Sequence, residues 1–392
     1  MTQNRLFAPI LFAVCVLALG ACSKLKTASS PDAPPTDAEW KDGYKVLFVG
    51  DTDFGESYRK LDDDILKHGY DFGFEKVKPF LDAADLVIAN LETPICDPAA
   101  AESPFEGKKD YIHWAHVEKA PEHLKKNKIL TVSLANNHTL DYGIPGLKQS
   151  LETLAKNGMT GFGAGLTQAD AERPFETTFT IGEREVRLAV FAAFEHSLRY
   201  ETMYSFYAKG DAPGAAMLDA ERTSQLVREY RAANPDAFVI VYPHWGGNYA
   251  WKTRKQGPIA RAVLEAGADA VIGHGAHTLQ EIERVAGKTA IYNVGNFVFS
   301  SPGRYKKYKV TPYGLAALVR FAPGKDGALR ADARLYPIHI DNRVVKYQPR
   351  PLTDAEFAGL KTTLAEKSGE GFAKRVSTGK DALGNFFSVR LK

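Results

Sequence analysis

Residues 130–138 read Leu-Thr-Val-Ser-Leu-Ala-Asn-Asn-His, an apolar run of strand length that ends in polar side chains. The same form recurs in four stretches that carry Asp, Glu or His at or near their ends: KVLFVGD (45–51), LVIANLE (86–92), FVIVYPHWG (238–246) and AVIGHGAH (270–277). In an open α/β sheet the carboxyl ends of neighbouring strands meet at one edge, so these motifs predict one convergent polar site. Carboxylate, amide and imidazole groups brought together in this way predict a dinuclear metal centre.

The composition is that of an ordinary globular protein. The chain has 392 residues, of which 44% are hydrophobic and 25% are charged, which is enough for the core of one large domain or two modest ones. The formal net charge of +3 requires no nucleic-acid partner. We also find no basic patch interleaved with aromatic residues and no zinc-finger or helix-turn-helix spacing. We therefore expect no nucleic acid among the partners.

The amino-terminal residues predict export and lipid attachment. Arg5 precedes an apolar run at 6–21 that is short for a membrane span and ends in small residues, which is typical of a secretory signal. Residues 19–22, Leu-Gly-Ala-Cys, are similar to a bacterial lipobox, which implies cleavage after residue 21 and a lipid on Cys22. The alternative is a plain signal peptide, residues 1–21, with a chance cysteine. We expect a lipid-anchored protein of the cell envelope, and Ser23 carries no inner-membrane retention signal, which favours the outer membrane.

The next residues divide into a tether and a folded region. Residues 22–42 are rich in Ser, Pro, Ala and charged residues and predict a flexible tether. Between residues 43 and 300, strand-like apolar runs alternate with helical patterns, for example at 145–158 and 258–267. This alternation predicts a single α/β or α+β sandwich with helices outside the sheets.

The carboxyl-terminal residues 301–392 have a different pattern. Two longer strand-like runs flank the turn PGKDG at 323–327 and predict a hairpin. A helical stretch at 354–369 and a last strand at 385–391 follow. We expect this region to extend the same domain.

The first three motifs provide candidate oxygen ligands and one candidate catalytic residue. Asp51 presents a carboxylate at a strand end, although Asp in that position also caps helices and turns. Asn90 and Glu92 share one face of the next strand, and their oxygens suit Mn, Fe, Mg or Zn. Asn90 is also a candidate for substrate contact. Asn137 and His138 end an apolar run, where polar groups are costly without partners. The alternative is an Asx-turn before a helix, with His138 on the surface.

The later motifs provide imidazoles. His244 ends the most apolar run, where a lone histidine is also common as a core residue, and small spacers let His274 and His277 face one point. Trp245 predicts either a substrate-contacting wall or core packing. His196 follows the strand-like run at 186–194 and is a candidate for substrate contact by position alone. The other histidines in and near the motif region are expected on the surface: His68, His113, His116 and His123.

Taken together, the motifs GD, NLE, LANNH followed by DYG, HWG, GHGAH followed by LQ, and IYNVGNFVF resemble the poly-γ-glutamate capsule-synthesis protein family, CapA. The resemblance covers residues 44–299 and implies a calcineurin-like metallophosphatase fold, a four-layer sandwich of two β-sheets flanked by helices. It implies His138 as the residue that faces the substrate. It also implies one or two divalent metal ions, held by Asp51, Glu92, Asn137, His244, His274 and His277. Gly275 and Ala276 stand where the family usually has His-Pro.

Three functions follow from this resemblance and from the residues. The first is a membrane-anchored protein with a metallophosphoesterase-type site that acts in synthesis, export or anchoring of a capsule polymer such as poly-γ-glutamate. Its partners would be the membrane, through Cys22, an anionic polymer or phosphoester substrate, and a synthase complex. The second is a non-catalytic subunit that binds polymer or braces a capsule synthase. The third is a periplasmic metal-dependent phosphatase or nucleotidase unrelated to capsule.

Overall fold

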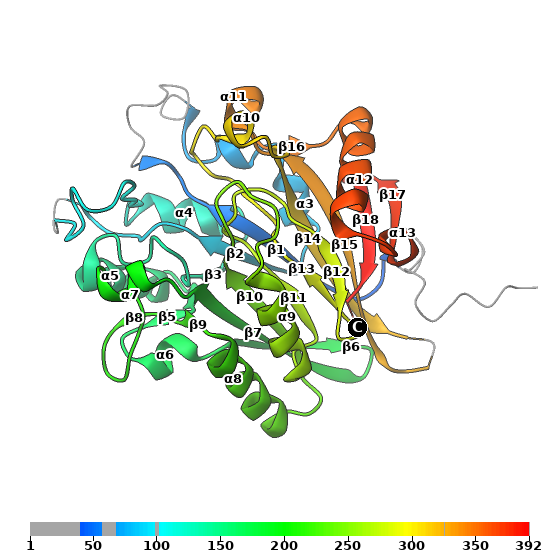
Figure 1. The fold of residues 1–392 in the computed structure, drawn as a ribbon, viewed down its shortest axis with the longest axis horizontal. Coiled ribbons are helices and arrows are strands. Elements are labelled where there is room, and N and C mark those ends of the chain that lie inside the picture. Colours follow the sequence, from blue (N-terminus) through cyan, green and yellow to red (C-terminus); the bar gives the residue numbers. More distant parts are fainter. Residues whose placement is uncertain (1–39, 57–67, 99–101, 325, 392) are drawn as a thin grey trace, which may run out of the picture. The chain divides into compact units, whose positions relative to one another are not determined.

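The computed structural model describes residues 40–56, 68–98, 102–324 and 326–391 (Figure 1). The described residues belong to one compact unit. The predicted signal peptide, Cys22 and most of the predicted tether lie outside the described residues. No helix in the described part of the chain is both long and apolar enough to cross a membrane.

The first sheet joins strands from both ends of the described chain. Its strands are β1 (Tyr44–Thr52), β2 (Leu86–Leu91), β3 (Thr131–Ser133), β4 (Thr160–Phe162), β14 (Tyr313–Pro323), β15 (Leu329–His339), β16 (Arg350–Pro351), β17 (Val376–Asp381) and β18 (Gly384–Arg390). They lie in the order β17-β18-β15-β14-β1-β2-β3-β4, and β16 pairs with β15. Strands β1 to β4 run parallel, whereas β14 pairs antiparallel with β1.

The second sheet is built from the middle of the chain. Its strands are β6 (Phe175–Ile181), β7 (Arg184–Glu195), β9 (Met217–Leu218), β10 (Phe238–His244), β11 (Ala270–Ile272), β12 (Ile282–Val285) and β13 (Lys288–Ile291). The order is β12-β13-β11-β10-β7-β6, and β9 pairs with β7. The central strands β7, β10, β11 and β13 are parallel. Two short strands, β5 (Ala164–Gly165) and β8 (Gly214–Ala215), form a separate pair.

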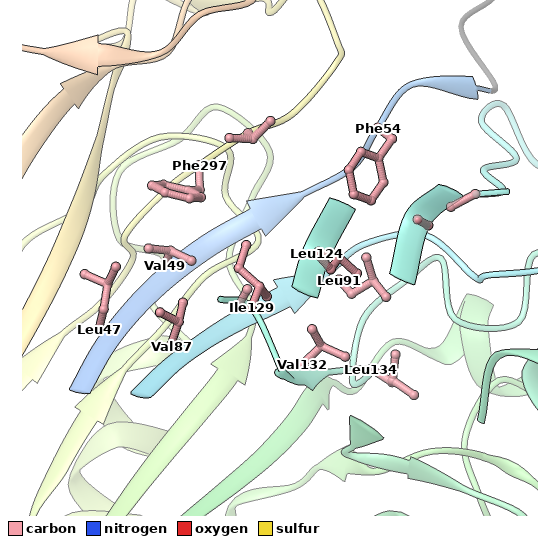
Figure 2. Packing of buried hydrophobic residues seen from close by; sticks show 14 of the residues in the cluster. Leu47, Val49, Phe54, Val87, Leu91, Leu124, Ile129, Val132, Leu134 and Phe297 are labelled. Carbon is pink, nitrogen blue, oxygen red and sulfur yellow. The ribbon is translucent and has the colours of Figure 1, made fainter. Parts of the chain in front are cut away.

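Alternating side chains on the strands create a core between the sheets and a second core outside each of them. On β1, Val46 and Phe48 pack with residues of the second sheet such as Ile240. Leu47 and Val49 belong to a different cluster, which also contains residues of the covering helices (Figure 2). Each such buried side chain contributes about 1.5–3 kcal/mol relative to exposure. The period of two along β1 is therefore what allows one strand to serve two cores.

Helices cover the outer faces of both sheets. The helices are η2, a 3-10 turn (Phe72–Phe74), α3 (Lys78–Asp82), α4 (Lys119–Lys126), α5 (Gly143–Lys156), α6 (Gln168–Glu172), α7 (Leu198–Thr202), α8 (Ala220–Ala233), α9 (Gln256–Glu265), α10 (Tyr305–Tyr308), α11 (Asn342–Val345), α12 (Asp354–Ser368) and α13 (Phe372–Arg375). Helices α4 and α5 pack on the first sheet, with Leu124 and Leu147 in its outer cluster. Helices α8 and α9 pack on the second sheet through Val227 and Val263. The predicted four-layer sandwich of two sheets flanked by helices is confirmed.

The carboxyl-terminal residues supply strands to the first sheet. The predicted hairpin is β14 and β15, which pair antiparallel over their whole length, and the predicted helix is α12. Thr353 and Glu356 form a capping box that starts this helix. Strand β17 was not predicted, because its exposed, polar sequence does not alternate clearly. Since β14 pairs with β1, the strand that carries Asp51 lies between two neighbours.

A close backbone contact positions the end of β1. The Asp51 amide donates to the carbonyl of Gly295 at 3.2 Å, and the Phe297 amide donates to the Asp51 carbonyl at 2.9 Å. A Cβ atom on Gly50 would lie 1.6 Å from the Gly295 carbonyl oxygen. Only glycine allows this approach. The motif IYNVGNFVF and the Gly-Asp strand end therefore form one backbone contact that depends on Gly50.

We expect Gly50→Ala to destabilise the protein by about 3 kcal/mol or more, because the added methyl group overlaps a backbone carbonyl that cannot rotate away. The matched control is Gly359→Ala in α12, where no atom lies within 4 Å of the added carbon. That control should stabilise the protein by roughly 0.5–1 kcal/mol, since alanine is the better helix former. Denaturant unfolding of both variants measures the free energy of unfolding. Equal stability of Gly50→Ala and the parent would contradict the requirement for glycine at position 50.

Candidate metal centre

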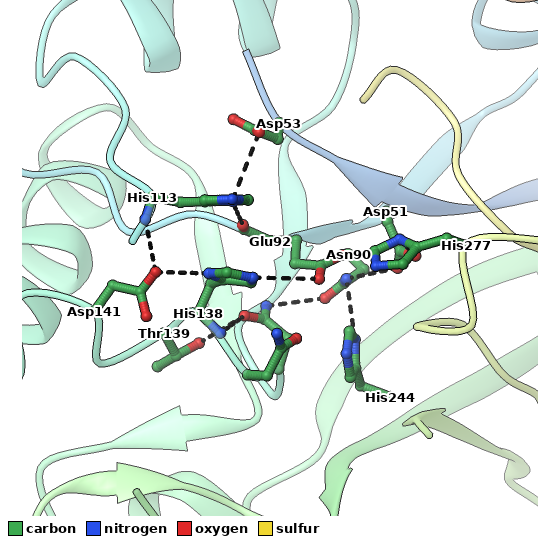
Figure 3. A network of polar contacts seen from close by, with 12 residues as sticks. Asp51, Asp53, Asn90, Glu92, His113, His138, Thr139, Asp141, His244 and His277 are labelled. Carbon is green, nitrogen blue, oxygen red and sulfur yellow. Dashed lines mark hydrogen bonds and ion pairs between the residues drawn. The ribbon is translucent and has the colours of Figure 1, made fainter. Parts of the chain in front are cut away.

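Four of the predicted ligands, Asp51, Glu92, His244 and His277, lie close together near the strand ends (Figure 3). Two groups of three side chains have ligand atoms that all lie within 4.8 Å of one another. The first group is Asp51, His244 and His274, and the second is Asp51, Glu92 and His277. Asp51 belongs to both groups. Within the described residues, the geometry therefore provides two adjacent candidate metal positions that share one carboxylate.

Several ligand atoms at this site are buried and lack hydrogen-bond partners. Among the described residues, unpartnered buried atoms include Asp51 Oδ2, both carboxylate oxygens of Glu92, Asn137 Oδ1 and His274 Nε2. Leaving such groups unpaired in the interior is costly. Divalent cations at the two positions would satisfy the carboxylate and imidazole atoms, because two carboxylates and three imidazoles are suitable ligands for Mn, Fe, Mg or Zn. The family resemblance adds the amide oxygen of Asn137. The residues present therefore fit the metal centre that the family resemblance implies.

The protonation preferences of the candidate ligands reflect their burial and their proximity to one another. Burial would raise the pKa of Asp51, but hydrogen bonds to His274 and His277 outweigh it and hold that pKa below its usual range. Burial raises the pKa of Glu92 well above its usual range, and the nearby charges of Asp51 and Asp53 add to this shift. Burial also lowers the pKa of His244, which favours the neutral imidazole that binds metals.

Asparagine side chains hold Asp51 in place. Asn90 Nδ2 donates to Asp51 Oδ1 at 2.9 Å, and Asn136 Nδ2 donates to Asn90 Oδ1 at 3.0 Å. Asn90 is fully buried and does not line the cavity described below. The structure thus places Asn90 behind Asp51, as a support for the ligand, and not at the position of a substrate contact. Asn136, which sequence reasoning did not single out, extends this support to the Leu91 carbonyl at 2.8 Å.

The last motif keeps both of its histidines in the site. His274 Nδ1 lies 3.2 Å from His244 Nδ1, and His277 Nδ1 lies 3.3 Å from Asp51 Oδ2. Gly275 has φ +100°, and a Cβ atom there would lie 2.9 Å from three atoms of the His244 ring. The glycine thus leaves the His244 ring its place. Both three-residue groups exist without a histidine at position 275.

A hydrogen-bonded group on the other side of the site orients His138. Its Nδ1 atom lies 2.6 Å from Asp141 Oδ2, and its Nε2 atom lies 3.8 Å from Glu92 Oε1. Lys109 Nζ contacts Asp141 and donates to the Asn137 carbonyl at 2.7 Å. Neither Lys109 nor Asp141 was singled out from the sequence. The DYG that follows LANNH places Asp141 three residues after His138, whereas Lys109 comes from a distant loop.

The expectation that His113 lies on the surface is wrong. His113 is buried, and its ring stacks on that of His138 with centroids 3.8 Å apart. Its Nδ1 atom lies 3.3 Å from the Glu92 carbonyl and 3.6 Å from Asp53 Oδ2. Burial raises the pKa of Asp53 to about 8. The loop that carries His113 is anchored because Ala115 pairs with Pro94 and Cys96 of the chain following β2, and this pairing has no sequence signature.

A cavity of about 270 Å³ opens beside the candidate ligands. Its lining includes Asn137, His138 and His277 from the site, and also Lys109, Asp110, Tyr111, His113, Arg199, Tyr200, Tyr204, Asn248, Tyr249, Phe299, Ser301 and Arg304. Trp245 is not among these residues. It is buried in the core, and its indole N–H donates to the Tyr292 carbonyl at 2.7 Å. His196 is exposed and pairs with Glu201 at 2.9 Å, so the structure does not bring it into this cavity.

Comparisons with known proteins give relatives that are named for capsule biosynthesis or polyglutamine synthesis. The PGA biosynthesis protein CapA of Bacillus subtilis is 28% identical over 355 residues, covering 90% of this chain and 85% of that protein. The capsule biosynthesis protein CapA of Bacillus anthracis is 26% identical and covers 79% of this chain and 70% of that protein. A protein of Mycobacterium tuberculosis named "probable polyglutamine synthesis accessory protein" is 29% identical, with 77% of each chain covered.

Among solved structures, GAP50, the anchor in the inner membrane complex of Plasmodium, aligns with 75% of this chain and 84% of that chain, at 12% identity and a TM-score of 0.36. That structural similarity is too low to support a conclusion about this chain. The family model is decisive, because the bacterial capsule synthesis protein model PGA_cap matches residues 45–301, which is more than half of the chain. The chain belongs to the bacterial capsule synthesis protein family PGA_cap.

Proposed function

We propose that this protein is a metal-dependent hydrolase of phosphoester or related acyl bonds that acts in the synthesis, export or anchoring of a capsule polymer. The observation that carries the proposal is the pair of three-residue groups that share Asp51 beside a cavity. Metal centres that activate water for hydrolysis commonly hold two ions close together, and a shared carboxylate is suited to that spacing.

Each residue has a defined part in this proposal. Asp51, Glu92, Asn137, His244, His274 and His277 would hold one or two divalent ions. When bound, such ions polarise the scissile bond and lower the pKa of a water molecule. His138 directs Nε2 toward Glu92, where it can exchange a proton with the leaving oxygen. Asp141 accepts from Nδ1 and sets the ring orientation, and Lys109 holds Asp141.

The cellular setting is also a proposal. Relatives are named for PGA biosynthesis, for capsule biosynthesis and for an accessory role in polyglutamine synthesis, which supports work alongside a synthase. The predicted lipid on Cys22 would hold the protein in the cell envelope, with the outer membrane favoured. Mass spectrometry of the mature amino terminus and fractionation of the two membranes would test both statements. An unmodified mature terminus would contradict the lipid anchor.

We expect the two candidate metal positions to be separable by substitution. Asp51→Asn should abolish binding at both positions, because its carboxylate belongs to both groups. His244→Ala should weaken only the first position and His277→Ala only the second. Each loss should exceed the about 10- to 100-fold that removal of an outer support costs. Elemental analysis and calorimetric titration measure this. Unchanged metal content in Asp51→Asn would contradict the shared ligand.

His138→Ala should reduce kcat by about 10²- to 10⁴-fold while the metal content stays near that of the parent, because His138 is proposed to move a proton and not to hold an ion. Hydrolysis of bis(p-nitrophenyl) phosphate by the metal-loaded full chain is the assay. The control is His196→Ala, an exposed histidine that does not line the cavity, which should keep full activity. A metal-free, inactive protein would favour the non-catalytic, polymer-binding role.

Lys109→Met should lower kcat while binding of metal is retained, because the substitution removes the ammonium that holds Asp141 in contact with His138. It should also destabilise the fold by about 3–5 kcal/mol, since Asp141 is left buried without its charged partner. The neighbouring Lys108→Met is the control, because Lys108 is exposed and points its ammonium to the Pro104 carbonyl. Full kcat in Lys109→Met would contradict the positioning role.

A further inference from the structure

A group of positively charged side chains beside the cavity lacks acidic partners. The group, which we term the basic strip, lies on and next to α10 and α11 and comprises Arg304, Lys306, Lys307, Lys309, Arg343 and Lys346. Among the residues that the structure describes, no carboxylate forms an ion pair with the side chain of any of the six. In contrast, Arg222, Arg334 and Arg350 each contact a carboxylate. One carboxylate lies within the group, that of Asp341 at the start of α11, whose Oδ1 accepts from the Arg343 backbone amide at 3.1 Å. The group therefore carries an excess of positive charge.

The two segments of the basic strip lie against the same stretch of backbone. Asn342 Nδ2 at the start of α11 donates to the carbonyls of Phe299 and Ser301, at 2.6 and 2.7 Å. Residue 301 is three positions before Arg304, and both Ser301 and Arg304 line the cavity. The basic strip therefore reaches the cavity at Arg304, whereas Lys309 lines a different pocket.

A series of ring contacts links the candidate metal centre to the basic strip. The ring of Tyr249 lies 5.3 Å from that of His277 and stacks on Tyr308 at 5.6 Å, with 6° between the planes. Lys307 Nζ in turn lies 5.4 Å from the centre of the Tyr308 ring. Each of these side chains contacts the next. The series therefore leads from His277, a candidate metal ligand, to the exposed ammonium group of Lys307.

Two arginines are held at the cavity mouth by neutral groups. The guanidinium of Arg304 lies 5.0 Å from the centre of the Tyr111 ring. Arg199 lies 5.5 Å from the centre of the Tyr204 ring and donates to the Lys108 carbonyl at 3.1 Å. These contacts orient the side chains while leaving their charge available. Asp110 is the carboxylate among the cavity-lining residues, and it pairs with neither arginine in the described structure.

The segment that contains α10 is a basic patch with aromatic residues, although no such patch was expected in this chain. Residues 304–309 read Arg-Tyr-Lys-Lys-Tyr-Lys, which is a short basic stretch interleaved with aromatic residues. The expected absence of such a patch is therefore wrong at this point. The net charge of the chain concealed the stretch, because acidic residues elsewhere balance it.

We propose that the basic strip and Arg199 form a binding track for an extended polycarboxylate chain, which the track delivers into the cavity at the candidate metal centre. This inference rests on the proposed function, because it assigns the polymer of that function to a surface. A linear polyanion can contact cations along its whole length. A small phosphoester would use only the cavity and leave the exposed cations of α10 and α11 without a role.

The features of the strip favour this ligand over other polyanions. A bilayer surface cannot enter the cavity that the strip reaches at Arg304. Nucleic acid binds such surfaces by stacking its bases on free aromatic faces. Tyr308 and Tyr111 are 44% and 45% exposed, and each already holds one ring contact, to Tyr249 and Arg304. Competition by an oligonucleotide is therefore part of the test. Repeated carboxylates on a flexible chain need only the cations.

The test is binding of fluorescein-labelled polyglutamate to the full chain in neutral detergent, followed by fluorescence anisotropy. Lys306→Gln/Lys307→Gln should weaken the affinity by about 10-fold, since each exposed cation contributes up to about 5-fold. Added salt should weaken binding of the parent more steeply than binding of this variant. The matched control is Lys148→Gln/Lys156→Gln on α5, which removes two exposed lysines away from the strip and should bind as the parent does.

Each outcome decides the proposal. Equal affinity of the strip variant and the parent, or equal weakening in the α5 control, would overturn the track. So would competition by phosphatidylglycerol micelles or by an oligonucleotide at concentrations where unlabelled polyglutamate does not compete. The track is separable from catalysis: Asp51→Asn should still bind polyglutamate with the same dependence on Lys306 and Lys307. If bis(p-nitrophenyl) phosphate is not hydrolysed but this binding pattern holds, the proposed hydrolysis fails and the track stands.

Discussion

The site depends on one buried carboxylate, that of Asp51. It lies at the end of β1 with no exposed surface, contacts His274, His277 and Asn90, and belongs to both candidate metal positions. A carboxylate in such surroundings is costly unless cations or donors surround it. The rest of the site can be understood as the set of groups that meet this requirement. They come from both sheets, which explains why the two sheets must pack with their strand ends aligned.

The sandwich meets that requirement through its backbone. The Gly295 carbonyl approaches Gly50 so closely that a side chain at position 50 is excluded, and the Phe297 amide holds the Asp51 carbonyl. Across the interface, the Tyr242 hydroxyl donates to the carbonyl of Val49. These contacts fasten the second sheet to the end of β1. The distances between the candidate ligands therefore depend on these backbone contacts, while the side chains provide the ligand atoms.

The parts of the site that were predicted from the sequence share one property. Each strand-end motif pairs a buried apolar run with a polar residue. Burial of that polar residue is unfavourable unless hydrogen bonds or a metal ion satisfy it. Asp51, Glu92, Asn137, His138, His244, His274 and His277 all follow this form, and the structure brings them together. Trp245 and His196 also stand next to strand ends, but Trp245 turns into the core and His196 stays in solvent. Adjacency to a strand end does not determine on which side of the backbone a side chain lies.

The sequence by itself determined many of the strands and helices, a sandwich with helices outside its sheets, and the polar residues at the strand ends, because these depend on local periodicity and on the cost of burying polar groups. The two-sheet, four-layer form followed from the family resemblance. Only the tertiary structure decided that Lys109, His113 and Asp53 belong beside His138, and that residues 304–309 border the cavity. Lys109, His113 and Asp53 lie outside the strands and helices, and α10 has only four residues, so no periodic pattern identifies them. Their positions follow from contacts between segments far apart in the chain, such as Ala115 with Pro94, and from the closure of the two sheets around Asp51.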